Sequence, residues 1–126
     1  MYLLSICIPT FNRASYLEIT LSSICSQSIF RDSNLVEIVI SDNNSNDSTE
    51  KLCCSYIAQY GQKIKYFKNT TNVHDVNFEN VLAGGSGYLL KLNNDTLVHK
   101  KDSLEIMLRY VDLYLHDKPV LFFMVF

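Results

Sequence analysis

The 126-residue sequence is poor in glycine and proline, with 4 and 2 residues respectively. This scarcity argues against a low-complexity or disordered chain, because such segments are rich in these residues. Neither sign of charge dominates, since 11 basic and 13 acidic residues leave a formal net charge of −2. The chain also lacks a stripe of lysine and arginine, and we therefore expect no nucleic-acid partner.

Long hydrophobic runs are missing as well, and none approaches the roughly 20 residues that a membrane-spanning helix needs. The N-terminal apolar run has no basic segment before it and meets Pro9 at once. We interpret it as a strand rather than a signal peptide, and a cytoplasmic location is the default expectation. Cys7, Cys25, Cys53 and Cys54 form no C-x-x-C pair, which disfavours a zinc site. We expect them to be buried free thiols.

Signatures of several common sites are absent. Without a glycine-rich loop, the sequence has neither a P-loop nor a dinucleotide-binding fingerprint. The three histidines, His74, His99 and His116, do not stand near a serine or cysteine in a pattern typical of nucleophilic catalysis. Residues 42–47 superficially resemble a calcium-binding EF-hand loop, but the required later glycine and glutamate are missing.

What the sequence does contain is a regular alternation of strand-like and helix-like segments. Short apolar runs predict strands, and apolar residues at helical spacing between them predict helices. This alternation implies parallel β-α-β units, with helices on both faces of the sheet. We predict an α/β fold, with a mostly parallel sheet of about five strands, in a single domain over residues 1–126. The expected strands are residues 3–8, 36–40, 63–67, 88–92 and 120–126, and the expected helices are residues 13–27, 47–60, 76–83 and 102–116.

Capping signals locate the ends of two predicted helices. Ser15 and Glu18 have the spacing of a capping box at the start of the first helix. Asp47 suits the N-terminal cap of the second helix, and Gly61 suits its C-terminal end.

Polar segments directly follow three predicted strands, at residues 10–13, 42–47 and 93–96. Ligands of open parallel sheets bind outside the carboxyl ends of the strands. The first segment opens a helix whose N–H groups favour a phosphate, and Arg13 adds positive charge. The second segment carries side-chain acceptors for a base or ribose. In the third, Asp95 stands beside amide side chains and suits a divalent cation. Each segment alone is also typical of an ordinary turn or helix cap.

Taken together and in this order, the three segments resemble the family 2 glycosyltransferases of the GT-A fold. Residues 5–13 resemble the family's opening strand and turn, and residues 39–47 resemble its second strand with an acidic residue and a Ser-x-Asp. The segment at residues 93–96 stands in the place of the family's Asp-x-Asp motif. The stretch before that motif is matched by Asn72, Asn80, Ala83 and residues 85–92.

The resemblance implies a Rossmann-like GT-A half that binds a nucleoside diphosphate sugar together with Mn²⁺ or Mg²⁺. It also implies an inverting transfer of the sugar to a glycan or lipid-linked acceptor, as in surface polysaccharide synthesis, with a carboxylate as general base. Thr10 and Asp42 are then expected to contact the nucleoside, Asn93 the ribose or phosphate, and Asp95 the metal. The residues expected to bind the nucleotide sugar are Pro9, Thr10, Asn12, Arg13, Asp42, Asn44, Asn93 and Asn94.

Several positions depart from the family's pattern. Asn93 replaces the first acid of the Asp-x-Asp motif, His74 stands where many members have glycine, and Glu79 where many have arginine. We expect the domain to be incomplete at its C-terminus, with the general base beyond Phe126, so we name no catalytic residue. The missing part is also where we expect any peripheral association with the inner face of the membrane.

Two other functions are weighed against a glycosyltransferase. One is a nucleotide-binding module or fragment without transferase activity. The other is a flavodoxin-like or receiver-like signalling domain, which is disfavoured because the first strand ends in Pro9 and Thr10 without an acid pair.

Overall fold

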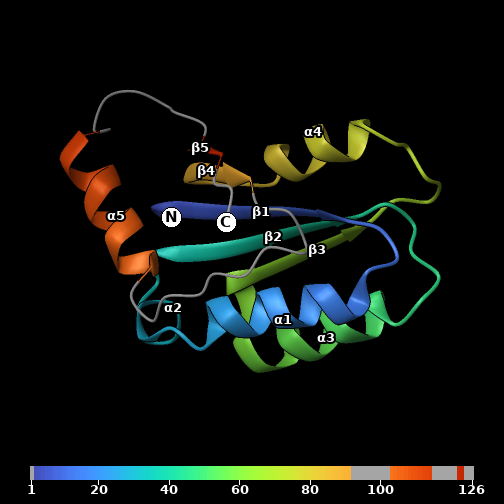
Figure 1. Cartoon of the computed structure of the whole chain (residues 1–126), viewed down its shortest axis with the longest axis horizontal. Coiled ribbons are helices and arrows are strands. Elements are labelled where there is room, and N and C mark those ends of the chain that lie inside the picture. Colours follow the sequence, from blue (N-terminus) through green and yellow to red (C-terminus); the bar gives the residue numbers. More distant parts are fainter. Residues whose placement is uncertain (1, 92–102, 115–121, 124–126) are drawn as a thin grey trace.

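The computed structural model describes residues 2–91, 103–114 and 122–123. Within these residues, parallel strands form one sheet in the order β3-β2-β1-β4-β5 (Figure 1). β5 contributes only two residues, so four longer strands make up most of the sheet. The predicted α/β fold with a parallel sheet is therefore confirmed. The strands are β1 (Leu4–Thr10), β2 (Val36–Asp42), β3 (Ile64–Lys68), β4 (Tyr88–Lys91) and β5 (Phe122–Phe123).

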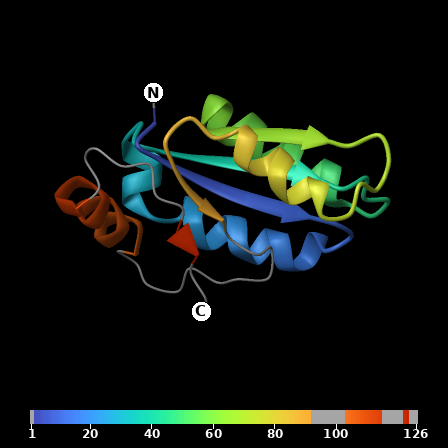
Figure 2. The same cartoon turned by 90° about the horizontal axis from the view of Figure 1, so that it is seen from above.

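Helices cover both faces of this sheet, as the near-continuous apolar strands predict. Figures 1 and 2 show α1 and α3 side by side on one face and α4 on the other. In the part of the chain that the structure describes, no helix is both long and apolar enough to cross a membrane. The helices are α1 (Ala14–Cys25), α2 (Ser28–Asp32), α3 (Thr49–Tyr60), α4 (Val76–Ala83) and α5 (Ser103–Tyr114), with a 3-10 turn at η1 (Gly61–Lys63).

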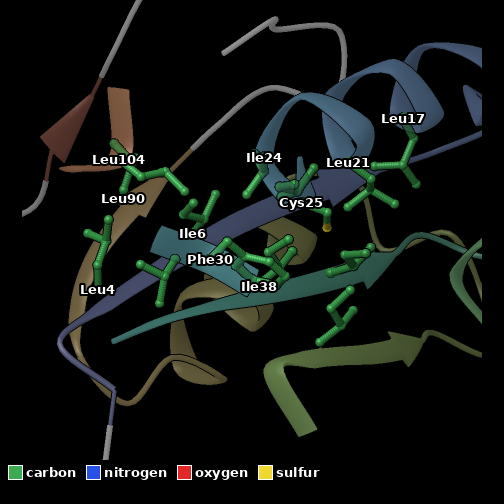
Figure 3. Close-up of a cluster of buried hydrophobic side chains, with 14 of the residues drawn as sticks. Leu4, Ile6, Leu17, Leu21, Ile24, Cys25, Phe30, Ile38, Leu90 and Leu104 are labelled. Carbon is green, nitrogen blue, oxygen red and sulfur yellow. The ribbon is translucent and has the colours of Figure 1, made fainter. Parts of the chain in front are cut away.

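The alternation of side chains along β1 divides the core into two clusters. Leu4, Ile6 and Ile8 belong to the larger cluster, which packs against α1, α2 and α5 (Figure 3). Cys7 points to the opposite face, where it packs with Val39 of β2 and Val81 of α4. Burial of each large apolar side chain stabilises the fold by about 1.5–3 kcal/mol. These two clusters hold the strands, and therefore their carboxyl ends, in fixed register.

The predicted helix at residues 13–27 agrees with α1 to within two residues at each end, and a second short helix that was not predicted follows it. α1 ends at Cys25, and Gln27 takes an extended conformation with φ −76° and ψ 134° before α2 begins. The buried side chain of Gln27 donates to the carbonyl of Ser23 and accepts the N–H of Leu104 in α5. The break therefore gives α5 a polar anchor, and α2 is an element that the sequence pattern did not reveal.

The predicted capping box at Ser15 and Glu18 is wrong. The N-cap of α1 is Arg13, which makes no side-chain capping hydrogen bond, and Ser15 already lies inside the helix. The helix starts earlier because the N–H of Ala14 donates to the carboxylate of Asp47, 33 residues away. A cap supplied by another loop is invisible to a local sequence pattern.

Other predicted boundaries agree closely with the structure. Gly61 ends α3 with φ 67°, a left-handed conformation that glycine adopts without strain. The predicted segments at residues 88–92, 102–116 and 120–126 each extend beyond the described residues, so their outer boundaries stay predictions. All four cysteines are free, but Cys54 is exposed, so the prediction of burial was wrong for this one.

Candidate functional site

The carboxyl ends of β1 and β2 lie side by side at one edge of the sheet (Figure 1). Thr10 and Asp42 are direct register partners at the last positions of the two strands. Just beyond them, the N–H of Asn43 donates to the carbonyl of Thr10 at 2.9 Å. Two of the three polar segments predicted from the sequence therefore meet where ligands of parallel sheets bind.

The loops that follow these strands are joined by further hydrogen bonds. The N–H of Asn12 donates to Oγ of Ser45 at 2.8 Å, and the N–H of Asn46 donates to Oδ1 of Asn12 at 2.8 Å. Asn12 and Asn44 both have positive φ, at 48° and 65°. Asparagine tolerates this left-handed conformation better than most residues do, which explains why these bends carry asparagine.

Asp42 is completely buried, and its carboxylate organises the second loop. Oδ1 accepts hydrogen bonds from the N–H and the hydroxyl of Ser45, and Oδ2 accepts the hydroxyl of Tyr66 at 2.6 Å. A carboxylate has about four acceptor positions, so these three bonds leave one. Burial and the hydrogen bond to the charged Asp42 raise the pKa of the Tyr66 hydroxyl well above its ordinary value. Tyr66 therefore stays a proton donor at neutral pH.

A network of asparagine side chains fixes the segment between β3 and α4 against the end of β2. Asn43 accepts the N–H of Val73 at 2.7 Å and donates to Asn72 at 2.7 Å. The buried side chain of Asn77 accepts the hydroxyl of Ser41 at 2.6 Å and donates to the carbonyl of Ser41 at 2.9 Å. This network borders the site on the α4 side of the sheet.

Sequence reasoning did not assign a role to Tyr66 or Asn77, and it included Asn43 only as part of the segment at residues 42–47. Tyr66 lies inside a strand, where an aromatic residue is ordinary. Asn77 carries the clearer signal, because it lies one helical turn before the buried Val81, on the side of α4 that faces the sheet. A polar residue on a buried helix face usually has a hydrogen-bonding task.

The other predicted site residues lie close to these loops or outside the described residues. Pro9 is half-buried in β1, while Arg13 is exposed at the start of α1 with its guanidinium 5.8 Å from the centre of the Tyr16 ring. The predicted ligands of the third segment, Asn93, Asn94 and Asp95, lie outside the described residues.

No three histidine, cysteine, aspartate or glutamate side chains gather as a metal site within residues 2–91, 103–114 and 122–123. Asp42 receives N–H and O–H donors on both oxygens, which suits a hydrogen-bonding role better than metal ligation. The assignment of the metal to Asp95 stays a prediction, because Asp95 lies outside the described residues.

Comparison with known proteins gives these features a family. The family model for glycosyl transferase family 2 matches residues 5–120. The chain belongs to this family. It is 41% identical over 124 residues to the abequosyltransferase RfbV of Salmonella typhimurium, an alignment that covers 92% of this chain and 36% of that protein. The chain is also 41% identical over 66 residues to a Campylobacter jejuni protein, GalNAc(5)-diNAcBac-PP-undecaprenol beta-1,3-glucosyltransferase. That alignment covers 52% of this chain and 20% of the Campylobacter protein.

Solved structures share the fold at lower sequence identity. S. aureus TarS 1-349 in complex with UDP superposes with a TM-score of 0.75 at 23% identity, covering 87% of this chain and 32% of that one. The mannosyltransferase PcManGT from Pyrobaculum calidifontis, in complex with GDP-Man and Mn²⁺, has a TM-score of 0.71 at 21% identity, covering 86% and 32%. The chain thus has the GT-A fold of this family and spans about a third of the length of these proteins.

Family membership gives meaning to the backbone at His74. This residue has φ 52°, in the left-handed region, and it is the position where the resemblance to the family leads us to expect glycine. The bend is kept here with a side chain that is strained by it, while the N–H of His74 donates to Oδ1 of Asn72 at 2.9 Å.

Proposed function

We propose that the chain forms the nucleotide-sugar-binding part of a glycosyltransferase that transfers a sugar from a nucleoside diphosphate to a glycan or lipid-linked acceptor. The observation that carries the proposal is the meeting of Thr10 and Asp42 at the carboxyl edge of the sheet, with their loops joined by hydrogen bonds. This edge is where open parallel sheets bind nucleotides. The chain belongs to a glycosyltransferase family, and two structural relatives were solved with UDP or GDP-Man.

In this proposal, the nucleoside binds across the ends of β1 and β2. Thr10 and Asp42 are the proposed contacts at these strand ends, and the completely buried Asp42 also holds Ser45 and Tyr66 in place. The exposed side chains of Asn12 and Asn44 border the same surface. Arg13, at the start of α1, supplies positive charge for the diphosphate.

The proposed cation ligand is Asp95, with Asn93 and Asn94 at the ribose or phosphates. Asp95 follows β4, which pairs with β1 in the sheet. Mn²⁺ or Mg²⁺ bound there would neutralise charge on the departing nucleoside diphosphate. Support comes from the relative that was solved with Mn²⁺.

In this proposal, a lipid-linked acceptor would bring the activity to the inner face of the cytoplasmic membrane. The support is the name of the Campylobacter relative, which includes a diphosphate-linked undecaprenol. A module that binds the nucleotide without transferring the sugar is the second candidate. The chain spans about a third of the length of the relatives that it matches.

Ligand-dependent thermal unfolding tests the proposal. UDP-, GDP- and dTDP-sugars are added singly, with Mn²⁺ or with EDTA. At about 100 times Kd, a bound ligand stabilises the native state by about 2.7 kcal/mol, which raises the melting temperature by several degrees. We expect such a rise with one nucleotide class, and we expect EDTA to reduce it. No rise with any of them would reject the proposal.

Two aspartate variants test the metal ligand. Asp95→Ala should remove the metal-dependent part of the rise and leave the unliganded melting temperature nearly unchanged. Asp32→Ala is the control, because Asp32 is an exposed carboxylate at the end of α2, just before the amino end of β2, whereas the site loops follow the carboxyl ends of the strands. Equal Mn²⁺-dependent rises in Asp95→Ala and the parent would reject the role of Asp95.

Mass spectrometry of acceptor products then separates a transferase from a binding module.

A further inference from the structure

One carboxylate lies between the first turns of two helices. Oδ2 of Asp47 accepts the N–H of Ala14, the first residue of α1, at 3.2 Å. Oδ1 of Asp47 accepts the N–H of Thr49, the first residue of α3, at 3.0 Å, together with the hydroxyl of Thr49. These two helices begin 35 positions apart in the sequence, so Asp47 is a tertiary contact as well as a local cap.

The residues at the usual cap positions of α1 and α3 do not perform this task. The N-cap residues of the two helices, Arg13 and Ser48, make no side-chain capping hydrogen bond. The unpaired N–H groups of a helix start favour a negative charge. Burial acts to raise the pKa of Asp47, but the hydrogen bonds from Thr49 and Ala14 outweigh it and hold the pKa below its ordinary value. Asp47 is therefore charged at neutral pH.

The contact from Asp47 is the last in a row of contacts between the two loops. Thr10 accepts the N–H of Asn43 at the strand ends. Asn12 then bonds to Ser45 and Asn46, and Ala14 to Asp47. We call this row the loop ladder. It extends the pairing of β1 with β2 beyond the sheet, so that both loops lie in one fixed arrangement.

We propose that Asp47 is a positioning residue, which fixes the two loops that border the nucleotide site by joining the starts of α1 and α3. This inference rests on the proposed function. The strand ends are held by backbone pairing of Thr10 with Asp42 and do not need Asp47. Loss of Asp47 should therefore loosen the loops, and with them Asn12 and Asn44, while the sheet keeps its register. Nucleotide affinity is then affected more than the fold.

Two substitutions distinguish loss of both helix contacts of Asp47 from loss of only one. Asp47→Ala removes both acceptors. Asp47→Asn keeps one carbonyl acceptor but turns an NH₂ group towards the other N–H donor, so it can serve only one helix. We expect Asp47→Ala to weaken UDP or GDP binding about tenfold, which corresponds to about 1.4 kcal/mol. Asp47→Asn should lie between Asp47→Ala and the parent.

The control must lose stability without touching the loops. Ile24→Val shortens a fully buried side chain near the other end of α1. If this variant loses a similar amount of melting temperature and keeps the parent affinity, the affinity loss in Asp47→Ala is a matter of positioning. Amide hydrogen exchange of Ala14 and Thr49, measured on the nucleotide-free protein, should accelerate in Asp47→Ala and not in Ile24→Val.

The outcomes are distinct. Binding of UDP or GDP by the parent, undiminished in Asp47→Ala, overturns the positioning role and leaves the proposed function standing. An equal affinity loss in Ile24→Val also overturns it, since general stability then accounts for the effect. If the parent binds none of UDP, GDP and dTDP with Mn²⁺ present, the proposed function fails, and the positioning role fails with it.

Discussion

Single residues set the shape of the loops at the carboxyl edge of the sheet. Asn12, Asn44 and His74 each have positive φ, and each lies in a loop that contacts the end of β1 or β2. For an L-residue this conformation costs about 1–2 kcal/mol. Asparagine adopts this conformation more readily than most residues do, whereas only glycine adopts it without any Cβ contact.

Replacing His74 with glycine should stabilise the protein. Glycine removes the Cβ strain at φ 52° but loses more backbone entropy on folding, by about 0.5–1 kcal/mol. We expect a net gain of about 0.5 kcal/mol in the free energy of unfolding, measured by urea denaturation. The neighbouring Asp75 has φ −65°, so Asp75→Gly removes no strain and should destabilise. A loss of stability in His74→Gly would show that this strain is negligible.

Site residues were predictable from the sequence where a polar residue directly follows an apolar strand. Thr10 and Asp42 stand out as polar residues directly after apolar runs. Tyr66 does not, because its task depends on the register between β2 and β3, which pairs Ile40 with Tyr66 two positions before Asp42. The dual contact of Asp47 was predicted only in its local half, as a helix cap.

At the scale of elements, a buried carboxylate connects three strands with the loop before β4. Glu37 of β2 is fully buried. Its Oε1 accepts the hydroxyl of Ser5 at 2.6 Å and the N–H of Ser86 at 2.8 Å, and its Oε2 lies 3.0 Å from Nζ of Lys65. Burial acts to raise the pKa of Glu37, but hydrogen bonds from Ser5, Ser86 and Lys65 outweigh it and lower the pKa.

Replacing Glu37 with glutamine should therefore destabilise the sheet. The amide keeps one acceptor but cannot pair with Lys65, so we expect a loss of about 2–3 kcal/mol in the free energy of unfolding. Because the folded pKa is lowered, the stabilisation by Glu37 is present above the unfolded pKa of about 4.3 and is lost as pH falls through the folded pKa. In urea denaturation series between neutral pH and pH of about 3, the free energy of unfolding should fall less steeply with decreasing pH in Glu37→Gln than in the parent.

The matched control is Glu50→Gln, on the exposed pair between Glu50 and Lys68. An exposed ion pair contributes about 0–1 kcal/mol, so this variant should stay close to the parent. Equal effects of the two substitutions would mean that the buried network contributes no more than a surface pair.

Elements with strong internal patterns were predictable, and elements defined by tertiary contacts were not. The apolar run of β2 and the helical repeat of α3 gave boundaries within two residues of the structure. α2 was missed because it is only five residues long. It is separated from α1 by the extended residue Gln27, whose buried side-chain amide accepts a hydrogen bond from α5. The strand order β3-β2-β1-β4-β5 also lies beyond a one-sequence pattern, since it is set by which apolar faces pack together.

At the scale of the whole molecule, the buried ionisable groups limit stability at both ends of the pH range. Glu37 is stabilising only while charged, which sets an acid limit. Burial raises the pKa of the thiols of Cys7, Cys25 and Cys53 to about 12. In the unfolded chain these thiols ionise near their ordinary pKa of about 8.5. Between these values the unfolded state binds fewer protons than the folded state, so stability falls as pH rises.

Adjacent cysteines allow this alkaline loss to be tested within one helix. Cys53 is fully buried and Cys54 is exposed. Each buried thiol contributes a slope of up to about −1.4 kcal/mol per pH unit above its unfolded pKa. Cys53→Ala should lower stability at neutral pH by about 1 kcal/mol through lost packing, yet make the decline between about pH 9 and pH 11 shallower. Cys54→Ala should leave both quantities near the parent values. Urea denaturation in reducing buffer measures them, and an unchanged slope in Cys53→Ala would show that this thiol ionises as readily in the folded protein as in the unfolded chain.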